Sequence, residues 1–162
     1  MKSSFSISIF FLLLILGTSC EVKPGFHDYA DLDKFLKNTD TVRFNFKSDD
    51  SVSLNNVWLG IRYSSDYEWS RFFAGYEIRD SVGHRLDSGL LQALLFDPVS
   101  GVPSGKSGIG DLYEMEQQVK RNFRFSKPGE YRFIFWQMMR QDSVRGIKSL
   151  GLRVAPAGDK SQ

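Results

Sequence analysis

The sequence predicts an all-β protein, an antiparallel β-sandwich of immunoglobulin-like or jelly-roll-like kind with a short N-terminal arm or helix. Several segments alternate apolar and polar residues with a period of two, which is typical of strands with one buried face. Clusters of turn-forming residues separate these segments at short intervals, leaving room for seven or eight strands and little helix. The third observation is an apolar run at residues 131–139, whose length and ring-rich composition favour a strand.

That run has two apolar sides. Alternation places one set of side chains on each side of the strand. These sets are Tyr131, Phe133, Phe135 and Met139 on one side, and Ile134, Trp136 and Met138 on the other. Both sides being apolar, we expect a central strand that is covered on both faces. The chain's own segment 26–36 is the candidate cover for the side that carries Trp136.

The first 19 residues resemble an export signal. Lys2 supplies a positive start, residues 9–16 are unbroken apolar, and Gly17, Thr18 and Ser19 are small. An apolar run of this length is too short to cross a bilayer, which needs about 20 residues. We therefore assign residues 1–19 to a signal peptide, residues 20–26 to a tether, residues 27–156 to one sandwich domain, and residues 157–162 to a disordered tail.

Cys20, the chain's one cysteine, directly follows the small residues. This arrangement resembles a bacterial lipobox, which implies a thioether to diacylglycerol and an N-terminus acylated with a chain such as palmitate. Gly17 and Ser19 also suit ordinary small-x-small cleavage, which would leave a free thiol on a secreted protein. One cysteine excludes a disulfide within the chain, so the fold depends on packing.

The strands follow in order. Residues 26–36 have loosely helical apolar spacing, and an extended arm over the sheet fits equally well. Residues 41–47, 57–63 and 71–79 alternate as strands. In residues 85–96 the leucines break the alternation, so we expect a bulged strand rather than one helical turn.

The second half begins with residues 97–110, which hold two prolines and four glycines and predict a long loop. A strand is expected from about Gln117 to Phe125. Residues 126–130, with Pro128 and Gly129, predict a reversal into the aromatic run. Residues 150–154 alternate again, which makes three antiparallel strands in this part of the chain.

The residues give little support for catalysis. His27 and His84 are the two histidines, and neither has carboxylates at ligand spacing. The segment 101–107 looks like a phosphate loop, but it has three residues between its glycines where the pattern needs four. We expect a protein that is not an enzyme, with no metal and no cofactor. The mature chain has 20 basic and 19 acidic residues (21 less Lys2), so no nucleic acid partner is indicated.

The aromatic residues carry the remaining signal, because 14 Phe, 6 Tyr and 3 Trp exceed what a small core needs. We expect an outward-facing contact patch among Trp58, Tyr67, Trp69 and Trp136. Flat rings on a surface serve protein contact or sugar stacking. A carbohydrate-binding envelope lipoprotein is therefore the alternative function, with a glycan as its ligand.

The C-terminal part of the chain contains a distinctive set of residues, namely Gln137, Met139, Arg140, Gly146, Ile147, Gly151 and Arg153. With these residues the chain resembles the gliding-motility lipoproteins of the GldH type from Bacteroidetes. Departures include Phe35 where tryptophan is expected and Arg71 where asparagine is favoured. From the residues alone, Gly146 and Gly151 are expected to permit turn geometry or close backbone approach. Arg140 is expected to pair with Asp142.

The resemblance implies a lipid-anchored envelope protein that is connected with the gliding apparatus and, through it, with type IX secretion. Its partners would be the membrane, through the lipid, and other envelope proteins. Residues 21–24 lack the acidic run that resembles a surface-export signal in these bacteria. We therefore expect the outer membrane, with the periplasmic face favoured over the cell surface.

Overall fold

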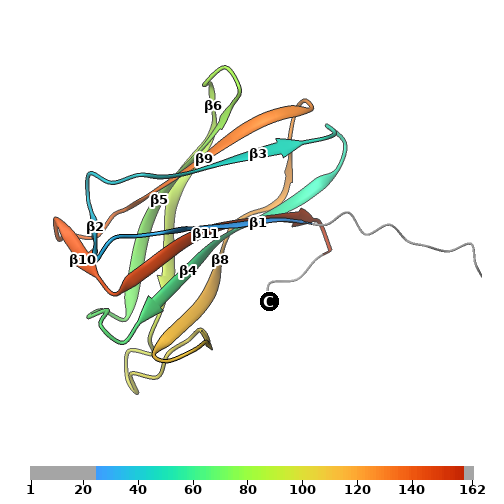
Figure 1. Cartoon of the computed structure of the whole chain (residues 1–162). Coiled ribbons are helices and arrows are strands. Elements are labelled where there is room, and N and C mark those ends of the chain that lie inside the picture. Colours follow the sequence, from blue (N-terminus) through green and yellow to red (C-terminus); the bar gives the residue numbers. More distant parts are fainter. Residues whose placement is uncertain (1–24, 159–162) are drawn as a thin grey trace, which may run out of the picture.

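Eleven strands and no helix make up residues 25–158, the part of the chain that the computed structural model describes. The strands are β1 (Phe26–Asp31), β2 (Phe35–Lys37), β3 (Val42–Ser48), β4 (Leu54–Ser64), β5 (Arg71–Asp80), β6 (Arg85–Leu94), β7 (Lys106–Ser107), β8 (Leu112–Arg124), β9 (Gly129–Gln137), β10 (Ser143–Arg145) and β11 (Ile147–Pro156). They form two layers, seen nearly edge-on in Figure 1, together with a small β10-β2 ribbon at one end.

The strand order identifies a jelly roll. One sheet has the order β1-β11-β4-β8-β7 and the other β3-β9-β5-β6, with every pair antiparallel. β1 pairs with β11, β3 with β9, β4 with β8, and β5 with β6. This nesting is what results when one long antiparallel hairpin is rolled up into two sheets. Of the two sandwich types expected from the sequence, the jelly-roll type is therefore the one observed.

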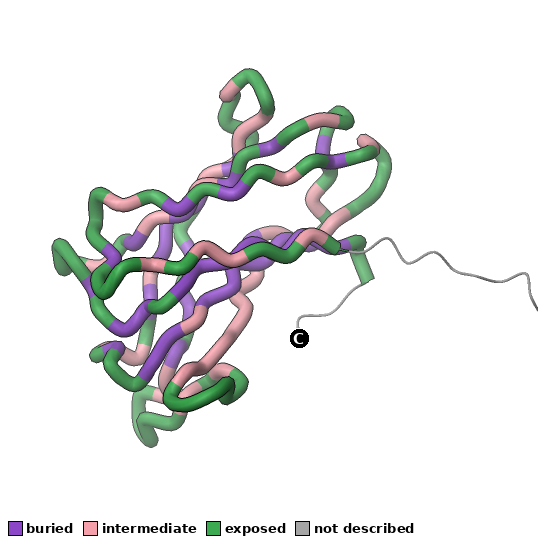
Figure 2. Tube along the Cα trace, viewed as in Figure 1, coloured by how far each residue is buried: buried purple, intermediate pink, exposed green. Residues whose placement is uncertain are grey.

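The core lies between the two sheets. Val57, Leu59, Ile61 and Tyr63 of β4 face it with no exposed surface, as the alternation predicted. Phe133 and Phe135 of β9 lie opposite them and are also fully buried. Figure 2 shows these buried stretches on both layers, with the exposed residues gathered at the turns. A continuous apolar layer of this kind is the main source of stability for a chain without disulfides.

The strands predicted at residues 41–47, 57–63, 71–79 and 131–139 are confirmed as β3, β4, β5 and β9. The leucine-rich segment is the strand β6, and its register with β5 shifts between Ile78 and Arg79, which confirms the bulge. β8 starts at Leu112, five residues earlier than predicted. The predicted loop at residues 97–110 contains the two-residue strand β7.

The N-terminal arm is extended, so its helical interpretation was wrong. Phe26–Asp31 forms β1, which pairs along its whole length with β11. The hydrogen bonds of a sheet edge thus outweigh a loosely helical spacing. Within the described residues there is no helix of the length and apolarity that a membrane crossing requires.

The position of β1 also overturns the expectation that both faces of β9 are covered. β9 is central, lying between β3 and β5, but β1 belongs to the other sheet. The side of β9 that carries Trp136 therefore has no layer of the described chain over it. Trp136 and Ile134 are half-buried, and Met138 is 51% exposed.

The predicted signal peptide at residues 1–19 and residues 20–24 of the predicted tether, Cys20 included, lie outside the described residues. The predicted tail at residues 157–162 is described only as far as Gly158. The described chain begins at Gly25, beside Val154 and Ala155 of β11.

Candidate functional site: the outer faces of the two sheets

Two outward-facing surfaces contain the residues of interest, one on each sheet. The polar face lies on β1, β11, β4 and β8, and consists of Tyr29, Trp58, Gly60, Arg62, Glu114, Glu116, Gly151 and Arg153. The aromatic face lies on β5, β6 and β9, and consists of Phe73, Gly75, Leu90, Ile134, Trp136 and Met138. In each strand these residues alternate with the buried core residues, so they point away from the core.

Two glycines form the floor of the polar face. Gly60 and Gly151 are paired across β4 and β11, and the ring of Tyr29 from β1 lies over both. A Cβ atom at either position would overlap the Tyr29 side chain. The missing side chains therefore allow a tyrosine to lie flat on the sheet.

Arg62 covers this tyrosine from the solvent side. Its guanidinium carbon lies 3.7 Å from the centre of the Tyr29 ring, a cation–π arrangement. Arg62 Nε also donates to Glu114 Oε2 at 2.6 Å. The Tyr29 hydroxyl is shielded from solvent and has no hydrogen-bond partner among the described residues. Burial, with the negative charge of Glu114 adding to it, raises the pKa of Tyr29 well above its ordinary value.

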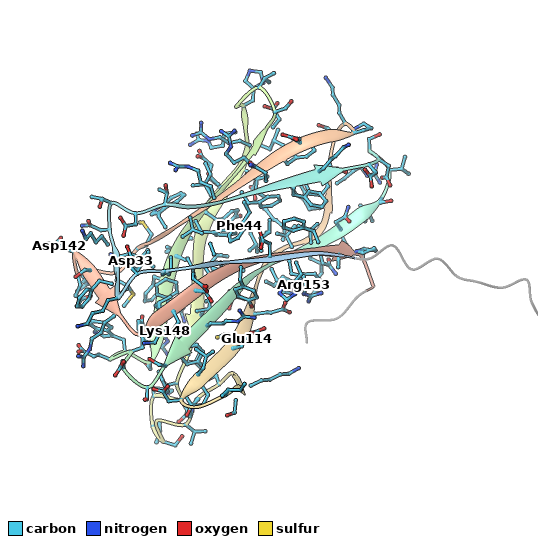
Figure 3. The ribbon with its side chains drawn as sticks, in the orientation of Figure 1. Asp33, Phe44, Glu114, Asp142, Lys148 and Arg153 are labelled. Carbon is cyan, nitrogen blue, oxygen red and sulfur yellow. The ribbon has the colours of Figure 1, made fainter. Side chains whose placement is uncertain are left out.

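A second stack lies beside the first, built in the same way. Arg153 of β11 lies 3.6 Å from the ring centre of Trp58 on β4. Its Nε and Nη2 atoms donate to the two carboxylate oxygens of Glu116 at 2.6 and 2.8 Å. The side chains of Arg153 and Glu116 are only 6% and 7% exposed. Figure 3 labels Arg153 and Glu114 on this layer, and Phe44 between the two layers.

The charged side chains of the polar face are paired with each other. The carboxylates of Glu114 and Glu116 are each held by an arginine, whose guanidinium stays protonated in proteins. The charge of each carboxylate is therefore matched by a fixed cation next to it. Residues 25–158 contain no group of three or more histidine, cysteine or acidic side chains that could hold a metal ion.

The aromatic face is built differently. The indole of Trp136 lies over Gly75, its cross-strand partner on β5, and a Cβ atom at Gly75 would overlap the ring. The indole nitrogen donates to the sulfur of Met138 at 3.0 Å. Leu90, the partner of Gly75 on the other side, is 61% exposed. A tryptophan, a methionine and a leucine thus adjoin on an open surface.

A shallow groove of about 540 Å³ lies where the described chain begins. Phe26 and Phe46 contribute an edge-to-face ring pair to it, with centres 5.7 Å apart. On its rim, Asp50 accepts hydrogen bonds from the backbone of Val52 and Ser53, so this carboxylate holds a turn. We assign the groove no chemistry.

The structure does not bring the four predicted contact rings together. Trp58 is buried beneath Arg153, and Tyr67 is buried with its hydroxyl donating to the carbonyl of Arg71. Trp69 packs against Tyr67 beside the core. Trp136 lies on the opposite sheet from Trp58 and is the one of the four on the aromatic face. A sugar platform that uses Trp58, Tyr67 and Trp69 jointly is therefore not formed.

The C-terminal motif residues mostly hold the chain between β9 and β11. Gln137 accepts from the backbone of Met139 at 2.6 Å and donates to the carbonyl of Gln141 at 3.0 Å. The Met139 sulfur in turn accepts from the backbone of Phe73 at 3.4 Å. Ile147 is buried. These contacts fix how the chain leaves β9.

Gly146 confirms the prediction made for it. Its φ is +84°, and a Cβ atom there would overlap the backbone of Tyr67. Gly151 also permits a close approach, but the ring of Tyr29 approaches it rather than backbone. The predicted Arg140–Asp142 pair is not observed within residues 25–158. Asp142 instead accepts from Asn38 at 3.0 Å, and Arg140 is exposed.

Sequence reasoning missed the two glycine floors and the partners of Arg153. Gly60, Gly75 and Glu116 were not singled out. A glycine in the middle of an otherwise well-patterned strand was the available signal, because it marks a place where another group approaches closely. Glu116 and Arg153 are 37 positions apart in the chain, and only the strand register shows that they meet.

Comparison with known proteins gives a consistent family assignment. The family model described as GldH lipoprotein matches residues 25–154. A protein of Christiangramia forsetii, named "Gliding motility lipoprotein GldH homolog", is 28% identical over 95% of this chain and 97% of its own length.

Two solved structures are also similar. The VP2 subviral particle of infectious bursal disease virus has 12% identity and a TM-score of 0.43, over 83% of this chain and 33% of that chain. A CocE/NonD family hydrolase from Staphylococcus aureus has 13% identity and a TM-score of 0.36, over 87% of this chain and 32% of that chain. Both TM-scores are below 0.5, so neither likeness carries an inference about function.

Proposed function

Because the chain belongs to the GldH lipoprotein family, we propose that this cell-envelope protein is a non-catalytic assembly component of the gliding-motility apparatus. Membership of a lipoprotein family makes it a membrane-anchored, gliding-motility-associated protein. The assembly role, the link to type IX secretion and the position on the periplasmic face of the outer membrane are parts of the proposal. Its partner is another protein of that apparatus, bound through the aromatic face.

The observation that carries the proposal is the open aromatic face. The sheet β3-β9-β5-β6 buries one side in the core and leaves the indole of Trp136 half-buried on the other. Contiguous exposed apolar surface that includes tryptophan and methionine is typical of protein contact sites. Leu90 is 61% exposed and Met138 is 51% exposed. A bound partner would remove their apolar surface from water, which favours binding.

The non-catalytic part of the proposal is supported by how the ionisable groups are engaged. Glu114 and Glu116 are held by Arg62 and Arg153. Glu77, which lies across from Ile134 on the aromatic face, forms ion pairs with Arg79 at 2.7 Å and with Arg85 at 3.6 Å. A catalytic carboxylate would need access to a substrate and a proton that it can accept.

A lipid anchor at Cys20 would increase the fraction of the protein that is bound to its partner through a weak contact. Between Cys20 and the described start at Gly25 there are few residues, and an extended chain covers at most about 3.6 Å per residue. The sandwich would stay within about 20 Å of its lipid. Confinement to a membrane surface raises the effective concentration of anchored partners, so a modest apolar face is sufficient.

The test is crosslinking in intact envelopes followed by capture of the lipoprotein and identification of the proteins attached to it. We expect proteins of the gliding apparatus with the wild type and their loss with Trp136→Ala. Phe35→Ala is the matched control, because Phe35 is an aromatic residue, 42% exposed, on the separate β10-β2 ribbon and outside the aromatic face. Capture that is unchanged by Trp136→Ala, or lost equally with Phe35→Ala, would contradict the proposal.

The position in the envelope is tested separately. Protease treatment of intact cells should leave the sandwich uncut, whereas the same treatment after the outer membrane is opened should cut exposed loops such as residues 97–105. Cleavage in intact cells would place the protein on the cell surface instead. The carbohydrate alternative now depends on Trp136 and on Trp69, which are both half-buried. Glycan-array binding that is lost on Trp136→Ala or on Trp69→Ala would favour it.

A further inference from the structure

β6 is the edge of its sheet, and we propose that two copies of this chain pair through it, antiparallel, to form one continuous eight-stranded sheet. This goes beyond the proposed function, since it names a second contact and its occupant. Within the described residues β6 pairs with β5 on one side and with no strand on the other. Alternate residues of this ten-residue strand therefore present backbone donors and acceptors at the open edge.

The apolar and polar side chains on the outward side of β6 follow the same order in both chain directions. From one end, the exposed side chains are Leu86, which lies at the bulge, and then Ser88, Leu90, Gln92 and Leu94 on the outward side. The order is apolar, polar, apolar, polar, apolar, and it is symmetric about Leu90. These leucines are 40%, 61% and 37% exposed.

This symmetry is the property that self-pairing requires. In an antiparallel pair related by a two-fold axis, a residue before the centre meets the residue equally far after it. With Leu90 at the axis, Leu90 meets Leu90, Leu86 meets Leu94, and Ser88 meets Gln92. Every apolar side chain then faces an apolar one, and each polar side chain faces a partner for a hydrogen bond.

The opposite edge of the same sheet is protected against such pairing. β3 presents Arg43, Asn45 and Lys47 outward, all exposed. A two-fold pairing centred on Asn45 would place Arg43 of one copy opposite Lys47 of the other, and like charges directly opposite each other are unfavourable. Charged side chains of this kind are a known way of keeping sheet edges apart.

β6 lacks this protection. Between Leu86 and Leu94 its one charged residue is Asp87, which points inward. Asp87 accepts from Tyr76 and forms an ion pair with Lys120 of β8, so its charge is neutralised within the same chain. These contacts also hold β6 against the other sheet, which keeps its free edge in place.

The pairing would enlarge the aromatic face. A two-fold axis perpendicular to the sheet keeps the outer faces of both copies on the same side. Leu90 of each copy adjoins its own Gly75 and Trp136, so both indoles lie on the same side of the eight-stranded sheet. Two docking surfaces presented side by side bind a repeated or symmetric partner more tightly than one.

Cysteine crosslinking in the native membrane tests both the contact and its register, with the full-length mature lipoprotein. Leu90→Cys should form a disulfide-linked dimer, because paired strands bring Cα atoms to about 4.5–5.5 Å, within the range of a disulfide. Leu86→Cys and Leu94→Cys should not dimerise when expressed alone. Co-expressed with different tags, they should give a mixed dimer.

Two controls define the background. The first is the wild type, because it has Cys20, which every variant also has. The second is Val52→Cys, which introduces a thiol at a 75%-exposed position in the loop between β3 and β4. No dimer from Leu90→Cys above these controls, or no mixed dimer from the Leu86→Cys and Leu94→Cys pair, would overturn the proposal. Equal dimer from Leu90→Cys and Val52→Cys would also overturn it, because it would indicate random collision.

A second measurement does not need a disulfide. Leu90→Lys places two charges together at the axis, so the protein in mild detergent should shift from dimer to monomer mass in sedimentation. Val52→Lys should leave the mass unchanged. Monomer mass for the wild type would contradict the proposal. Both experiments measure a dimer of this chain with itself, so the pairing can fail or hold independently of partner capture through Trp136.

Discussion

The outer faces of the two sheets differ in whether other side chains cover their aromatic rings. On the polar face, Trp58 lies beneath Arg153 and Tyr29 beneath Arg62, and each arginine is held by a glutamate. On the aromatic face, Trp136 lies on Gly75 with no charged group over it in any contact that the described residues make. One face is closed by the chain's own side chains, and the other is left open.

The difference shows that a ring on an outer face is not in itself a contact site. Trp58 is 2% exposed because an arginine covers it, while Trp136 is half-buried because its cover is missing. Both rings are on strands and both point away from the core. What separates them is the neighbour across the sheet, which is Arg153 for Trp58 and Gly75 for Trp136.

The largest expected effect is on stability when Trp58 is truncated. Trp58→Ala should lower the free energy of unfolding by about 3–5 kcal/mol, because it opens a cavity and removes the surface on which Arg153 stacks. Trp136→Ala should cost only about 1 kcal/mol, since its ring is already partly in water. Chemical denaturation measures both. Equal losses would remove the distinction between the two faces.

The ion pairs give the next comparison. Arg153→Ala should cost about 3–5 kcal/mol, because it leaves the carboxylate of Glu116 buried without its partner. Arg62→Ala should cost about 0–1 kcal/mol, since its pair with Glu114 is 35% and 39% exposed. Replacing Arg153 and Glu116 together by Met and Leu should recover much of the loss. A double variant as unstable as Arg153→Ala would show that the charge is not the cause.

The glycine floors should respond differently to the same added methyl group. Gly60→Ala should cost about 1–3 kcal/mol, because Tyr29 is held between the sheet and Arg62 and cannot move away. Gly75→Ala should cost less than about 1 kcal/mol, because the indole of Trp136 can swing into solvent. The tryptophan emission should then shift to longer wavelength. An unchanged emission spectrum for Gly75→Ala would contradict this account of the open face.

Of the two outer faces, the polar face is the one that alkaline pH should affect, because it carries Tyr29. Burial, then the charge of Glu114, raises the pKa of Tyr29 above its unfolded value of 10.0. A raised folded-state pKa contributes stability below pH 10 that is lost as the pH rises toward that folded value. Tyr29→Phe should therefore flatten the loss of stability above about pH 10.

At neutral pH the variant should be close to wild type, because the hydroxyl that it removes has no partner among the described residues. An unaltered alkaline slope would show that Tyr29 is not the group responsible.

Much of the fold could be predicted because its signals are local. Alternation in residues 41–47, 57–63 and 71–79 needed nothing beyond the neighbouring residues, and each strand was found. The arm was ambiguous because its partner, β11, is more than 100 residues away, and pairing with β11 decides its conformation. The choice between sandwich types also depends on which distant strands pair.

The surfaces were harder to predict for the same reason. Trp58 and Trp136 look alike along the chain, and only the register shows that one faces an arginine and the other a glycine. The Arg140–Asp142 pair looked plausible because the two residues are close in sequence. The partner of Asp142 is instead Asn38, which directly follows β2 and is distant from Asp142 in the sequence. Contacts between distant segments decide such sites, and a single sequence does not contain the register.

Hydroxyl-radical footprinting of the two tryptophans, in purified protein and in intact envelopes, tests the central contrast most directly. Trp58 should be protected from oxidation in both samples, because its cover belongs to the same chain. Trp136 should be oxidised readily in the purified protein and protected in envelopes, where the proposed partner covers it. Equal oxidation of Trp136 in both samples would contradict the account, since the open face would then have no occupant in the cell.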